Sequence, residues 1–109
     1  MSADASPRRM VRPMSRSMLE RKLIEVGERL KQLRAELVIT DEQMVQFVDE
    51  ADDARLRALV SETPLADRDH HEAQRHADAM SRHRAEVLST IEQLERRQDE
   101  LLDRLSAEG

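Results

Sequence analysis

Four residues near the middle of the chain, Ser61-Glu62-Thr63-Pro64, decide its fold. Proline lacks an amide proton and disfavours helical backbone angles in the residue before it, so a long helix is expected to end here. On both sides of this break, one set of positions recurs at alternating intervals of three and four residues, which is the spacing of a coiled-coil interface. The two sets mirror each other about residue 62, because the residue numbers of each facing pair sum to 124. The sequence therefore predicts an antiparallel helical hairpin.

We call these mirrored positions the seam, and they are mostly apolar. Before the turn they are Leu19, Leu23, Val26, Leu30, Leu33, Leu37, Thr40, Met44, Phe47, Ala51, Ala54 and Ala58. After the turn they are Ala66, His70, Ala73, Ala77, Met80, Arg84, Val87, Ile91, Leu94, Gln98, Leu101 and Leu105. Leucine predominates far from the turn and alanine next to it. We therefore expect the open end of the hairpin, its base, to be more stable than the turn end, its tip.

The expected fold class is all-α, a long two-helix coiled coil preceded by a tail. Residues 1–16 are rich in Ser, Pro and Arg without an apolar period, which indicates a disordered basic tail. Ser17 followed by Glu20 is a capping-box pattern, so we expect the hairpin over residues 17–107, with helices 17–60 and 65–106 and a turn at 61–64. The β-branched run 38–40 could divide the first helix and give three helices in all. We expect one continuous helix, because the seam passes through this run without a skip.

Composition limits the class of protein. The chain has 109 residues, 38% of them charged, and a single aromatic residue, which indicates one domain without a thick globular core. The absence of cysteine excludes disulfides, thiol catalysis and cysteine zinc sites. No apolar run approaches the roughly 20 residues of a membrane span, and no signal-peptide stretch is present, so we expect a cytoplasmic location. Sixteen of the eighteen basic residues are arginine, which favours a GC-rich bacterial genome.

No pattern indicates catalysis, a metal or a cofactor. The sequence contains no nucleophile–base pair, glycine-rich phosphate loop or His-Glu metal motif. Four histidines fall between His70 and His83, but none of their spacings gives two ligands one helical turn apart. We therefore expect a protein that is not an enzyme.

A second, shorter apolar stripe lies outside the seam and suggests self-association. Exposed aliphatic side chains at helical spacing are usually covered by another helical surface. We expect a homodimer, in which two hairpins could form a four-helix bundle; scattered surface aliphatic residues are the alternative. The candidate face consists of Val38, Val45, Val48, Leu59, Leu88 and Leu102, with Ala85 beside them.

Charged residues indicate further contacts. A basic flank at the base could receive phosphate or an acidic partner, although Glu25 and Glu100 are close enough along their helices to neutralise part of it. This basic flank consists of Lys22, Arg29, Arg97 and Arg104. The net charge of −5 argues against general nucleic-acid binding. Across the hairpin, the expected charge pairs are Arg57–Asp69, Arg55–Asp67 and Glu50–His76.

The function that these patterns favour is a non-enzymatic interaction or regulatory module that presents helix faces to a protein partner of unknown identity. The tip carries Glu62, Pro64, Asp67 and Asp69. In shape the hairpin resembles the Gre-type and DksA-type transcription factors, which carry acidic residues at a coiled-coil tip, and this resemblance implies insertion into RNA polymerase. It covers only the hairpin, because the chain lacks cysteines for a zinc module and residues for a second globular domain. A third alternative is binding of an anionic surface or nucleic acid through the Arg-rich tail and base. We expect no membrane partner.

Overall fold

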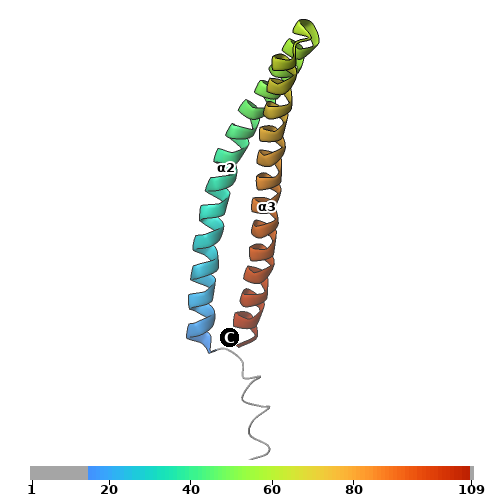
Figure 1. Cartoon of the computed structure of the whole chain (residues 1–109). Helices are drawn as coiled ribbons and strands as arrows, with labels where there is room; N and C mark the ends of the chain where they lie inside the picture. Colours follow the sequence, from blue (N-terminus) through green and yellow to red (C-terminus); the bar gives the residue numbers. More distant parts are fainter. Residues whose placement is uncertain (1–14, 109) are drawn as a thin grey trace, which may run out of the picture.

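The computed structural model describes residues 15–108, which form a hairpin of two long helices. Helix α2 spans Arg16–Ser61 and helix α3 spans Pro64–Glu108. The helices run antiparallel, are joined at the tip, and have their other ends together at the base (Figure 1). With 46 residues, α2 is about 69 Å long at a rise of 1.5 Å per residue. The predicted all-α helical hairpin is confirmed, whereas the coiled-coil geometry and the four-helix bundle stay predictions.

Burial follows the predicted seam closely. All 24 seam positions are buried or half-buried. Only five other residues between 15 and 108 are not exposed, and these are Gly27, Glu36, Leu88, Thr90 and Arg97. The main cluster of buried side chains lies in the base half of the hairpin and comprises Leu19, Val26, Leu30, Leu33, Val87, Ile91 and Leu101. Towards the tip the seam is mostly alanine.

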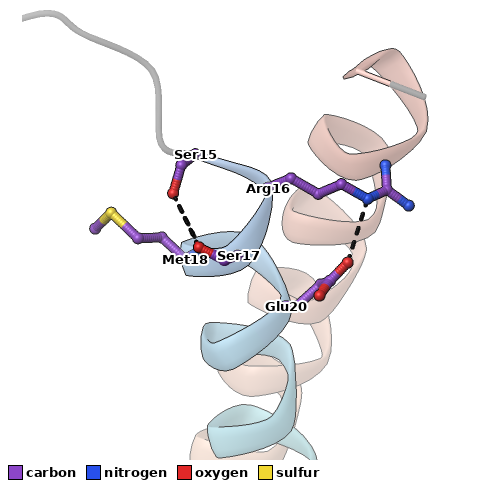
Figure 2. Close-up of polar contacts among 5 residues, drawn as sticks. All are labelled: Ser15, Arg16, Ser17, Met18 and Glu20. Carbon is purple, nitrogen blue, oxygen red and sulfur yellow. Dashed lines mark hydrogen bonds and ion pairs between the residues drawn. The ribbon is translucent and has the colours of Figure 1, made fainter.

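The N-cap of the first helix lies two residues before its predicted position. Ser15 has the extended backbone of an N-cap, and its hydroxyl accepts a hydrogen bond from the amide of Met18 at 3.3 Å. Figure 2 shows Glu20 turned towards Arg16, with which it forms an ion pair at 3.2 Å. The predicted capping box of Ser17 and Glu20 is therefore wrong, and Arg16 belongs to the helix. Residues 1–14 of the predicted tail lie outside the described residues.

Helix α2 continues without interruption through residues 38–40, as expected. Thr40 is a buried seam residue, and Arg84 is half-buried at the position predicted to face it. The Arg84 guanidinium leaves the seam and pairs with Asp41 on the flank. A long side chain can bury its stem while its charge reaches a partner near water. This contact gives the charge of Arg84 a partner.

The connection at the tip is shorter than predicted. Glu62 adopts a left-handed conformation with φ 50°, and its amide donates to the carbonyl of Ala58 at 3.1 Å. Thr63 then caps α3, because its hydroxyl accepts a hydrogen bond from the amide of Ala66 at 3.1 Å. Pro64 is the first residue of α3, a position where its missing amide proton leaves no hydrogen bond unmade. Only residues 62 and 63 lie between the helices, instead of the predicted 61–64.

Besides the Arg84–Asp41 pair, two ion pairs join the flanks of the hairpin. Arg34 pairs with Glu95 at 2.9 Å, and Glu36 pairs with His83 at 3.3 Å when the imidazole is protonated. The residue numbers of these two pairs sum to 129 and 119. These sums are five above and five below 124, the sum for each facing pair of seam residues. The cross-helix contacts therefore agree with the predicted register.

The three flank pairs predicted from the sequence are wrong. None of them is among the ion pairs formed within residues 15–108, and they are Arg57–Asp69, Arg55–Asp67 and Glu50–His76. That prediction assumed that facing residues lie at the same level along the two helices. The Arg34–Glu95 and Glu36–His83 pairs are instead five residues out of level. Each flank position occurs only once in every seven residues, so two charged residues on facing flanks can lie at different levels along the helix axes. Long side chains bridge this difference in level.

Candidate interaction surfaces

Exposed large apolar side chains are unevenly divided between the helices. Nine of the eleven within residues 15–108 lie on α2, and only Leu65 and Leu102 lie on α3. Those on α2 are Met18, Ile24, Val38, Ile39, Val45, Val48, Leu56, Leu59 and Val60. A helix that packs on a single partner normally has a polar outer face. The outer surface of α2 is therefore the principal candidate for a further contact.

Five of the six residues predicted for the second apolar face are on the surface. Val38, Val45 and Leu59 are 59–64% exposed, and Val48 and Leu102 are exposed to a smaller extent. Leu88 is only half-buried beside the seam.

Ile24 was missed in this set, although it is 65% exposed. Ile24 lies 14 residues before Val38, and Val45 and Leu59 follow Val38 by 7 and 21 residues. These four residues therefore occupy one heptad position. We call Ile24, Val38, Val45 and Leu59 the α2 stripe.

The equivalent outer position of α3 is polar. On α3, the same heptad position relative to the seam begins with Pro64 and otherwise contains one alanine among polar residues. All of its residues are exposed: Pro64, His71, Asp78, Ala85, Glu92, Asp99 and Ser106. An apolar outer stripe is thus a property of α2 and not of the hairpin pattern in general.

The tip combines acidic and apolar side chains. The predicted tip residues are all exposed, and Asp67 lies 3.7 Å from the ring of His71. Close to the same connection, Val60 is 84% exposed, and Leu56 and Leu65 are more than half exposed. We call Leu56, Val60 and Leu65 the tip group. The tip group was not predicted from the sequence, where the charges at the turn are the more obvious feature, although Val60 and Leu65 directly flank the predicted turn.

The four histidines lie in three environments, one of which is that of the exposed His71 beside Asp67. His76 and His83 line an open, mainly apolar hollow of about 320 Å³ together with Phe47, whose ring meets His76 edge-on at 6.1 Å. The Nδ1 atom of His70, in the seam, is buried without a hydrogen-bond partner. In the range 15–108, no three histidine, aspartate or glutamate side chains gather in a way that could hold a metal ion.

The basic residues of the base are partly compensated along their own helices. Lys22 lies 3.8 Å from Glu25, and Arg97 lies 3.5 Å from Glu100. The other two basic residues, Arg29 and Arg104, are exposed. Exposed ion pairs of this kind contribute little to stability, but they reduce the positive potential of the flank. The base is therefore a weaker candidate than the apolar surfaces.

Comparisons of the chain with protein-family models, curated proteins and solved structures find no match. Neither helix of the described hairpin contains a stretch apolar and long enough to cross a membrane.

Proposed function

We propose that this chain is a non-enzymatic coiled-coil interaction module that uses the tip of its hairpin to bind an apolar cleft on a protein partner. The supporting observation is the tip group, in which three aliphatic side chains are exposed within a few residues of the connection. Water contact at such a group is unfavourable, and binding that removes it is correspondingly favourable. Charged neighbours such as Glu62 and Asp67 would form a polar rim around this apolar centre, the usual arrangement of a protein interface.

The dimensions of the hairpin suit this role. A rod about 69 Å long carries its tip far from its base, so the tip can enter a recess while the base stays outside it. The buried leucine cluster lies in the base half, away from the tip group. Changes to the tip group are therefore expected to alter binding without unfolding the hairpin.

Site-specific photo-crosslinking in cells that express the chain tests this proposal. A photoreactive amino acid at Val60 is expected to form an adduct of one defined mass. The matched control is the exposed Arg96 on the outer face of α3, which should not form that adduct. Replacing Leu65 with Asp in the Val60 variant should abolish the adduct while circular dichroism stays helical. No adduct from Val60, or the same adducts from both positions, would contradict the proposal.

A second candidate is a transcription regulator that inserts an acidic tip into RNA polymerase. It is favoured by the position of Glu62 at the end of the hairpin, with Asp67 and Asp69 in the first turns of α3. In vitro transcription with the wild-type chain and with Glu62, Asp67 and Asp69 replaced by Ala distinguishes the two candidates. Loss of an effect on transcription in this variant supports the acidic tip, whereas an unchanged effect excludes it.

A further inference from the structure

The α2 stripe belongs to a series of six residues that is complementary to itself. At intervals of seven after Ser17, one outer position of α2 contains Ile24, Lys31, Val38, Val45, Asp52 and Leu59, and all six side chains are exposed. Read in reverse against itself, this series places isoleucine on leucine, lysine on aspartate and valine on valine. The residue numbers of each facing pair sum to 83. An antiparallel second copy of the same helix would therefore meet it with matched side chains.

We propose that a second copy of this chain docks on the α2 stripe, antiparallel to the first, around a twofold axis level with residues 41 and 42. In this register Ile24 faces Leu59 of the other copy, and Val38 faces Val45. Each contact occurs twice because a twofold interface is self-complementary. The axis lies close to the middle of α2, so the two copies of the helix overlap over residues 22–61.

The charged pair in this register has no competing partner. Neither Lys31 nor Asp52 belongs to any ion pair of the described chain, although other exposed charges along the hairpin do. In the proposed dimer, Lys31 of each copy faces Asp52 of the other. Complementary charge at the two ends of an apolar centre fixes the register and the direction of the partner helix.

The winding of the helices allows the contact to continue along α2. A position repeated every seven residues drifts by about 20° per heptad on a straight helix. The seam and the α2 stripe have the same repeat, so they wind together. Two hairpins that wind alike can therefore keep their stripes in contact, as the helices of a bundle do.

The same register brings one unfavourable pair together. Glu42 lies next to the axis and approaches Glu42 of the other copy. Asp41 also lies there, but its charge is compensated by Arg84 of the same chain. Removing the charge of Glu42 should therefore strengthen the dimer.

This inference does not depend on the proposed binding function. Val60 and Leu65 occupy other positions of their helices and lie outside the six-residue series. Variants of these two residues should leave the dimer unchanged, and variants of the α2 stripe should leave the tip group in place. Failure of one proposal can thus be distinguished from failure of the other.

Light scattering on a size-exclusion column tests the dimer and its register. The wild-type chain should have twice its monomer mass of 12.6 kDa. Lys31→Asp and Asp52→Lys should each raise the dimer dissociation constant by about tenfold, because each places like charges face to face twice. The two substitutions together should restore the dimer. Glu42→Gln should lower the dissociation constant, and Val45→Glu should give a monomer that is still helical by circular dichroism.

The matched control is Glu92→Lys, which changes charge at the equivalent outer position of α3 and should leave the mass unchanged. A monomeric wild-type chain would overturn the proposal. A dimer that withstands both single charge reversals, or one that the double exchange fails to restore, would also overturn it. A dimer not strengthened by Glu42→Gln would contradict the position of the axis.

Discussion

Two adjacent leucines near the end of α3 provide a stringent test of the hairpin. Leu101 is fully buried, with 0% of its surface exposed, whereas Leu102 is 46% exposed. Both lie well inside the helix, so replacing either by Ala changes intrinsic helix propensity by the same amount. Any difference between the two variants therefore reports the burial of the side chain.

The expected losses follow from that burial. For Leu101→Ala, the lost apolar burial and the resulting cavity together give a loss of about 3 kcal/mol in the free energy of unfolding. For Leu102, about half of the side chain is covered, and full burial of a leucine stabilises by about 2 kcal/mol, so the expected loss is about 1 kcal/mol. The difference of about 2 kcal/mol should separate the urea midpoints by about 1 M.

Urea unfolding followed by circular dichroism at 222 nm is the appropriate assay, because the chain has no Trp or Tyr for fluorescence. Both substitutions are best made in the Val45→Glu background, so that self-association does not contribute. Equal midpoints, or a larger loss from Leu102→Ala, would show that α3 does not pack through the face described here.

Two substitutions that act through the conformational preference of the backbone should stabilise the hairpin in the same assay. Gly27→Ala should raise the free energy of unfolding by about 1 kcal/mol, because alanine is the better helix former and an added Cβ meets no atom within 4 Å. Glu62→Gly should raise it by about 1 kcal/mol, because glycine adopts the left-handed conformation of this residue without the steric cost that a side chain imposes. A loss of stability from Gly27→Ala would contradict the open space beside Gly27, and a loss from Glu62→Gly would contradict the left-handed cap.

The sequence predicts the interior of this molecule far better than its ends and flanks. The seam was predictable because its positions alternate at spacings of three and four residues and mirror each other about the turn, so two helices can bury them in only one register. Every seam position is at least half-buried in the structure. The cap of α2 was not, because Ser15 and Ser17 are both good cap residues and only the backbone angles distinguish them.

Flank contacts and the turn depend on details that a residue pattern does not contain. Arg34 reaches Glu95 because their side chains bridge an offset along the helix axes, which spacing alone does not reveal. The left-handed conformation of Glu62 is unusual for a residue with a side chain, so nothing in the sequence indicated it. Among the candidate surfaces, five of the six residues predicted for the second apolar face are exposed, whereas Ile24 and the tip group were recognised only from their exposure.

Engineered disulfides test directly which seam residues face each other across the hairpin. The chain has no cysteine, so pairs can be introduced without interference. Ala51→Cys with Ala73→Cys joins two seam positions whose numbers sum to 124, and the thin alanine layers there allow the short Cα separation that a disulfide needs. In the seam register, this pair should oxidise rapidly within one chain at low protein concentration, and the pair Ala51→Cys with Met80→Cys, one heptad away, should not. Oxidation of the second pair, or only intermolecular products from the first, would contradict this register.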